Sequence, residues 1–237
     1  MLLVDASGGM LRHARLAGGA LTQLGSAPHR GIEPDEWDAA LGSLAPAPRR
    51  VLVANGSGGG FALRFAEWVE RRWGVVAEFP AAAAGLSVDR WLSLVGARAR
   101  AAGPFVVVVA GPAFSVDLVD AGGRHRGGYR IPGERLMREV LHAQTSGVAA
   151  AALLDGPEVQ GAFGVTTAGA VQQGARLALA ALVERLVVRL AGDGAGARVL
   201  LTGAGGRDVA SLVDHPAEVV PDLVLEGLAR VAQGGAP

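Results

Sequence analysis

The spacing of apolar residues along the chain predicts several short, fully buried strands. Unbroken apolar runs bounded by glycine or proline are typical of such strands. They occur at Met1–Ser7, Arg49–Gly56, Phe105–Ala110 and Ala197–Gly206. The weak alternation after Ser7 predicts hairpin strands, and the segment after Ala110 predicts a second hairpin that turns at residues 121–123.

Between these strands, apolar residues recur at helical spacing. Helices are expected at residues 33–44, 60–74, 87–100, 133–147, 167–190 and 223–233. In the longest of them, one face is apolar and Glu184, Arg185 and Arg189 face away from it. That face contains Leu179, Leu182, Val183, Leu186, Val187 and Leu190. The four tryptophans, Trp37, Trp68, Trp73 and Trp91, have the spacing of helix residues that pack in a core.

The order of these elements indicates two related halves. A buried strand, a glycine turn, a hairpin, a helix, a strand and a helix follow one another twice. The sequence therefore predicts two α/β halves, residues 1–103 and 104–237. Clefts between such halves are favoured positions for ligands.

Composition and charge narrow the class of protein. The chain has 237 residues and 22 basic and 22 acidic side chains, so its formal net charge is zero. Nothing in this balance indicates a nucleic-acid partner. The absence of cysteine excludes disulfides and thiolate metal sites. The first residues lack the pattern of a signal peptide, and no apolar run approaches the roughly 20 residues of a membrane helix. A cytoplasmic protein with no membrane partner is expected.

The segment Gly111–Gly133 is rich in glycine although it follows an apolar strand. Two interpretations stay open from the residues alone. The glycines can simply form loose hairpin turns, or they can bring the backbone close to a ligand. If the strand alternates, Ser115 and Asp117 share one face, which either lines a ligand site or is solvated.

Five segments that occur in a fixed order resemble the type III pantothenate kinases. They are Ser87–Ala99, Gly111–Met137, Thr166–Ala175, Leu200–Gly206 and Leu223–Ala229. The first of them contains "SVDRW", similar to that family's G-V-D-R-W. The family shares the fold of acetate kinase, sugar kinases and actin. The resemblance implies two ribonuclease H-like halves with a central cleft. It also implies ATP-dependent phosphorylation of pantothenate to 4′-phosphopantothenate, toward coenzyme A, by a homodimer formed through helices of the C-terminal half.

The resemblance also assigns roles to individual residues. Asp89 is the expected catalytic base. Substrate contacts are expected from Arg90, Gly127, Gly128 and Thr167, and nucleotide contacts from Asp5, Ser7, Gly8, Gly9, Arg12, Gly111, Ser115, Gly205 and Gly206. ATP and Mg²⁺ are the expected cofactors, with Asp5 and Asp117 as candidate metal ligands. Simpler roles stay open for two of these residues. Asp89 can simply cap a helix, and Asp5 can simply form a turn, as aspartate often does.

The chain departs from the family pattern in both phosphate motifs. The first motif, D-x-G-N-T-x-x-K, is "DASGGMLR" here, beginning at Asp5. In the second, D-x-G-T-A-x-T-x-D, the leading aspartate falls on Val109, and the two threonines on Pro112 and Ser115. A monovalent cation site at Val109 would be lost. Three hypotheses therefore remain: a pantothenate kinase, a kinase for another small acceptor, and an inactive homologue with a binding or regulatory role.

Overall fold

The protein consists of two compact units, and each has its own sheet. The computed structural model describes residues 1–28, 34–82, 85–144, 163–191 and 196–235. One unit comprises residues 1–100 together with 222–237, and the other comprises residues 101–221. The predicted halves divided the chain once, at residue 103. The structure instead assigns residues 222–237 to the first unit, because the apolar face of the last helix packs on the first sheet.

The first unit contains a mixed five-stranded sheet in the order β3-β2-β1-β4-β5. The strands are β1 (Leu2–Ser7), β2 (Met10–Ala17), β3 (Ala20–Pro28), β4 (Val51–Asn55) and β5 (Ala77–Glu78). β1 lies antiparallel to β2 and parallel to β4. Gly8 and Gly9 join β1 to β2 with φ of 59° and 77°, as a tight hairpin turn requires. The predicted strands and first hairpin are confirmed, whereas β5 is too short to leave a sequence pattern.

An aromatic core covers one face of this sheet. It is formed by α1 (Pro34–Leu41) and α2 (Gly59–Trp73). Trp37 is fully buried and contacts Phe61, Phe65 and Trp68 edge to face, with ring centroids 5.1–6.0 Å apart. Such contacts add to the free energy gained by burying the rings. The packing role predicted for these tryptophans is confirmed.

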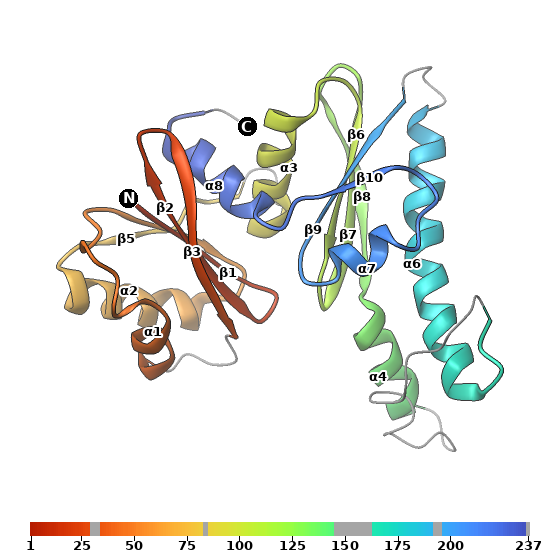
Figure 1. The fold of residues 1–237 in the computed structure, drawn as a ribbon, viewed down its shortest axis with the longest axis horizontal. Coiled ribbons are helices and arrows are strands. Elements are labelled where there is room, and N and C mark those ends of the chain that lie inside the picture. Colours follow the sequence, from red (N-terminus) through yellow and green to blue (C-terminus); the bar gives the residue numbers. More distant parts are fainter. Residues whose placement is uncertain (29–33, 83–84, 145–162, 192–195, 236–237) are drawn as a thin grey trace. The chain divides into compact units, whose positions relative to one another are not determined.

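The other face of the first sheet is covered by α3 (Val88–Arg100) and α8 (Leu223–Ala232), as Figure 1 shows. The two helices approach so closely that their backbones touch. A Cβ atom on Gly96 would lie 2.5 Å from the carbonyl oxygen of Leu223, and one on Gly227 would lie 2.0 Å from that of Leu92. Only glycine allows this approach. The contact fixes the position of α3 on the sheet.

The second unit contains a mixed five-stranded sheet in the order β10-β9-β6-β7-β8. The strands are β6 (Phe105–Ala110), β7 (Ala113–Val119), β8 (His125–Pro132), β9 (Arg198–Thr202) and β10 (Ala217–Val219). β7 and β8 form the predicted second hairpin, β6 lies antiparallel to β7, and β9 lies parallel to β6. The short strand β10 was not predicted.

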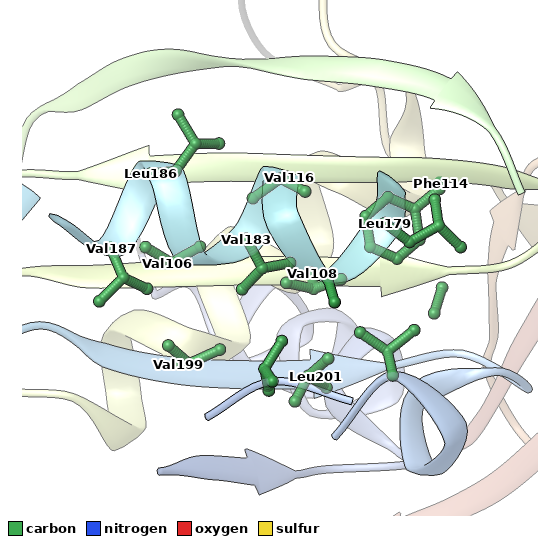
Figure 2. Close-up of a cluster of buried hydrophobic side chains, with 14 of the residues drawn as sticks. Val106, Val108, Phe114, Val116, Leu179, Val183, Leu186, Val187, Val199 and Leu201 are labelled. Carbon is green, nitrogen blue, oxygen red and sulfur yellow. The ribbon is translucent and has the colours of Figure 1, made fainter. Parts of the chain in front are cut away.

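A long helix packs against this second sheet. α6 (Thr167–Ala191) places its predicted apolar face on β6, β7 and β9. Figure 2 shows Leu179, Val183 and Leu186 of this helix in one cluster with the valines of the strands. α4 (Glu134–Gln144) lies beside α6, and the short α7 (Gly206–Ala210) follows β9. The predicted continuation of α4 to residue 147 lies outside the described residues.

Within the described part of the chain, no helix combines the length and the hydropathy that crossing a membrane would need.

Candidate active site

Asp5 lies in the middle of β1 with a side chain that is almost completely buried. Its Oδ1 accepts a hydrogen bond of 2.6 Å from the Ser7 hydroxyl. Arg12 is the cross-strand neighbour of Asp5 on β2. Directly opposed residues project from the same face of a sheet. For Asp5 and Arg12 this is the face that α3 and α8 cover, because the alternate residues Leu3 and Ala14 pack there.

The carboxyl group of Asp5 is electrostatically unusual. Burial raises its pKa from 3.8 to about 6, although the Ser7 hydrogen bond and the charge of Arg12 both oppose this shift. The negative charges of Asp89 and Asp222 raise the pKa further. Asp89 and Asp222 therefore lie within Coulombic reach of Asp5, as does Arg12. A site with this excess of negative charge favours a cation.

The raised pKa of Asp5 makes stability depend on pH. Below about pH 4 the carboxyl is protonated in both the folded and unfolded states, whereas above pH 6 the folded state holds a buried charge. Proton binding by Asp5 therefore contributes fully to the stability of the folded state below about pH 4, and this contribution is lost as pH rises through 6. We expect Asp5→Asn to gain stability relative to the unaltered protein between pH 4 and pH 7.5, by at most about 3 kcal/mol. Urea unfolding of both proteins at the two pH values measures this; an equal difference at both would contradict it.

Asp89 lies in the first turn of α3. The backbone N–H of Trp91 donates to the carbonyl oxygen of Ser87, which places Ser87 at the capping position. Asp89 is thus inside the helix, and the simpler interpretation that it caps the helix does not describe this structure. The Ser93 hydroxyl donates to the backbone carbonyl of Asp89 and leaves the carboxylate out of that bond. Arg90, the candidate substrate ligand, is the next residue of the same turn.

Asp222 is a residue of this site that the sequence analysis missed. It directly precedes α8, and its carbonyl oxygen accepts the N–H of Glu226. Its side chain does not cap the helix, and among the described residues its Oδ1 is buried without a hydrogen-bond partner. Burial raises its pKa, and the charge of Arg12 lowers it. In sequence, an aspartate before an apolar helix indicates only a cap, so no pattern distinguishes this residue.

In the second unit, three candidate nucleotide residues come together at the carboxyl ends of β6 and β9. Gly205 N–H donates to the carbonyl oxygen of Ala110, the neighbour of Gly111, over 3.0 Å. Gly206 begins α7 immediately afterwards. Gly203 has φ of 90°, and a Cβ there would lie 2.4 Å from the Ala110 oxygen. In α/β sheets, ligands bind outside the carboxyl ends of parallel strands.

Ser115 and Asp117 share one face of β7, and both are buried. The interpretation of a solvated face is therefore wrong. Asp117 Oδ1 lies 2.7 Å from His125 Nε2, which turns one carboxylate oxygen toward a neighbour in the same sheet. Val109 lies on β6, where it is paired with Ser115 of β7 on one side and with Thr202 of β9 on the other. Its side chain has no oxygen that a cation can bind.

The glycines of the second hairpin approach protein backbone. A Cβ on Gly128 would lie 2.2 Å from the carbonyl oxygen of Val116, and one on Gly133 would lie 2.2 Å from that of Gly111. Gly127 has φ of 98°, which favours glycine for conformation alone. These positions need glycine for the strands themselves. The substrate role of Gly127 and Gly128 stays a prediction.

Thr167 is the first residue of α6, and it lines an apolar groove between α4 and α6. The groove has a volume of 710 Å³. Met137, Val140 and Leu141 of α4 form one wall and Val171 of α6 part of the other. α4 has no buried residue, and Val140 and Leu141 are 51% and 43% exposed.

The predicted site residues thus form two groups. The first unit contains Asp5, Ser7, Gly8, Gly9, Arg12, Asp89 and Arg90. The second contains Gly111, Ser115, Asp117, Gly127, Gly128, Thr167, Gly205 and Gly206. The two candidate metal ligands, Asp5 and Asp117, fall in different groups. Among the described residues, no three acidic or histidine side chains are arranged to hold a metal.

Solved structures with this architecture define the class of fold. The crystal structure of a conserved putative Baf family transcriptional activator from Campylobacter jejuni superposes with a TM-score of 0.58 at 18% identity, covering 99% of this chain and 98% of that one. A putative 2-dehydro-3-deoxygalactonokinase from Sinorhizobium meliloti gives 0.56 at 17% identity, covering 100% and 99%. Two mixed sheets with these neighbours define the α/β fold of acetate kinase, sugar kinases and actin.

Sequence comparisons identify the family within this class. The family model for type III pantothenate kinase matches residues 61–189. The type III pantothenate kinase of Halorhodospira halophila is 36% identical over 250 residues, which cover 96% of this chain and 95% of that protein. That of Aromatoleum aromaticum is 33% identical over 252 residues, covering 98% of each. The chain belongs to the type III pantothenate kinase family.

Proposed function

We propose that this protein phosphorylates pantothenate with ATP, giving 4′-phosphopantothenate for coenzyme A synthesis. The observation that carries the proposal is the position of Asp89. It lies in the first turn of α3, within Coulombic reach of Asp5, on the sheet face that also carries Arg12. Phosphoryl transfer requires a group that accepts the hydroxyl proton and charges that position the phosphates. Asp89, Asp5 and Arg12 supply these groups.

Each residue has a defined task in this reaction. Asp89 accepts the proton of the pantothenate hydroxyl as the oxygen attacks phosphorus. Arg12 binds phosphate oxygens through its guanidinium, and Arg90 binds the pantothenate carboxylate in the same way. The turn at Gly8 and Gly9, which carries no side-chain donors, offers backbone N–H groups to a phosphate. Gly111, Gly205 and Gly206 leave space for the nucleotide at the strand ends of the second unit.

The residues around Asp5 fit a magnesium ion. Mg²⁺ binds proteins through one or two carboxylates and keeps several waters, so a single buried carboxylate beside substrate phosphates suits it. When bound, Mg²⁺ neutralises negative charge on the transferring phosphoryl group. Asp5 would hold it through its carboxylate, with Ser7 fixing the orientation. Val109 offers no ligand to a monovalent cation.

A direct assay tests the proposed function. The purified protein is incubated with ATP, Mg²⁺ and pantothenate, and the phosphorylated product is identified by mass spectrometry. We expect 4′-phosphopantothenate. If another small hydroxyl compound is phosphorylated and pantothenate is not, the protein is a kinase for that other acceptor. Nucleotide binding with no transfer to any acceptor would favour the inactive homologue, which the comparisons do not support.

We also propose that a second copy of the chain covers the α4–α6 groove. An exposed apolar surface of this kind marks an interaction site. We expect Val140→Glu to shift the protein from dimer to monomer in sedimentation velocity experiments at micromolar concentration, because a buried charge opposes the contact. Leu63→Glu is the matched control, since Leu63 is 65% exposed on α2 and is not a lining residue of the groove. An unaltered protein that sediments as a monomer would contradict the proposal.

A further inference from the structure

Asp222 is a polar side chain to which the reaction described above gives no task. It occupies the capping position of α8 and yet makes no capping hydrogen bond with its side chain. Aspartate is favoured at that position because its carboxylate can accept backbone N–H groups. Instead, Oδ1 of Asp222 is buried without a hydrogen-bond partner among the described residues. An unsatisfied buried polar atom in a native protein calls for an explanation.

The arrangement of the first unit brings Asp222 toward Arg12. α8 packs on β1, β2 and β4, on the sheet face that carries Asp5 and Arg12, and Asp222 directly precedes this helix. The contact of Gly96 with Leu223 and of Gly227 with Leu92 fixes this end of α8 against α3. The charge of Arg12 acts on both carboxylates, because it lowers the pKa of Asp5 and that of Asp222.

We propose that Asp222 is a positioning residue that holds the Arg12 guanidinium in place for the phosphates of the nucleotide. The inference rests on the proposed function, in which Arg12 contacts phosphate. A guanidinium has five N–H donors in a planar fork, so it can be held by one carboxylate and still present N–H groups elsewhere. With Asp222 as the anchor, Asp5 does not have to neutralise Arg12 alone and stays available to a cation.

A simpler electrostatic role for Asp222 predicts the opposite result. If Asp222 only added negative charge, removing that charge would reduce repulsion of the phosphates and tighten nucleotide binding. If Asp222 positions Arg12, removing it weakens nucleotide binding. The sign of the change in affinity therefore separates the two roles.

The variant Asp222→Asn tests this, because it keeps the shape and removes the charge. We expect the dissociation constant for Mg²⁺-ADP, measured by calorimetry, to rise about ten- to a hundredfold, as expected for loss of a charge-assisted hydrogen bond. The KM for ATP should rise by a similar factor with kcat little changed, since binding is lost in the ground state and the transition state alike. The urea midpoint should fall only slightly, because an ion pair at a partly exposed position contributes little to stability.

Two further variants make the test specific. In an Arg12→Met background, Asp222→Asn should have no further effect on nucleotide affinity, because the residue through which it acts is gone. Glu226→Gln is the matched control: it alters the next acidic residue of α8, whose Oε1 and Oε2 bind Arg100 at 2.6 Å, and it should leave nucleotide affinity unchanged.

The outcomes separate this inference from the proposed function. Unchanged or tighter nucleotide binding by Asp222→Asn, or an equal loss in the Arg12→Met background, overturns the positioning role. If the unaltered protein binds nucleotide without phosphorylating pantothenate, the proposed function fails and the binding measurements still decide. If it binds no nucleotide, the test uses the urea midpoints instead. The change in urea midpoint caused by Asp222→Asn must then differ between the unaltered and Arg12→Met backgrounds, and equal changes overturn the inference.

Discussion

Asp89→Asn is expected to reduce the rate of pantothenate phosphorylation by a factor of about 100 to 10,000, while the protein remains folded. That range is typical for the loss of a general base. The carboxamide has nearly the same shape as the carboxylate but cannot accept the hydroxyl proton. Because Ser87 and not Asp89 stands at the capping position of α3, the substitution leaves the start of the helix unchanged. Initial rates at saturating ATP and pantothenate measure the effect.

Two controls accompany this measurement. The urea midpoint of Asp89→Asn should match that of the unaltered protein, which shows that lost activity is not lost structure. Asp208→Asn supplies a matched aspartate in the first turn of another helix, α7, and should retain full activity. A loss of less than threefold for Asp89→Asn would mean that this residue is not the base, and that phosphoryl transfer here relies on another group.

The second large effect is expected from Gly227→Ala, in the contact between α8 and α3. The new Cβ would lie 2.0 Å from the carbonyl oxygen of Leu92, which is backbone and cannot rotate away. The helices must separate, and overpacking of this kind costs about 1–3 kcal/mol or more. We expect a corresponding loss in the free energy of unfolding, measured with urea. Nucleotide affinity should also fall, because the same contact holds Asp89 and Asp222 over the sheet.

The control for this variant is another helical glycine. Gly60 lies in α2 with no atom within 4 Å of its Cβ direction, and it has no left-handed φ. Gly60→Ala should be neutral or stabilising by up to about 1 kcal/mol, because alanine has the higher helix propensity. Equal destabilisation by both substitutions would show that the α3–α8 contact is not special.

Apolar periodicity was sufficient to predict most of the elements. β1, β4, β6 and β9 are central strands with unbroken apolar runs, and the long helix α6 buries the predicted face. The strands β5 and β10 escaped prediction because two or three residues carry no period. The assignment of α8 to the second half failed for a different reason. Its apolar face fits any sheet, and only the packing against α3 determines which one it covers.

The candidate site was less predictable than the fold. Asp5 and Asp89 were found through the family resemblance, and strand pairing brings Arg12 opposite Asp5. The sequence could not predict that Asp222 belongs to this site, because it lies 217 positions after Asp5. Only the packing of α8 on the first sheet brings the two residues into the same unit. The glycines of the second hairpin show a different limit, because one sequence pattern can have two structural explanations. A pattern that suits a ligand site is equally suited to closely packed strands, as Gly128 and Gly133 are here.

The return of α8 to the first sheet has a consequence for the order in which the protein folds during synthesis. Residues 101–221 form one continuous unit, so they can fold as soon as they leave the ribosome. Residues 1–100 leave earlier, but the sheet face that α3 and α8 share stays only partly covered until Leu225 and Leu228, both fully buried in the finished protein, have been translated. The part of the chain made first is therefore completed last. During that interval residues 1–100 expose apolar surface, and this surface is the part of the chain that most needs a chaperone.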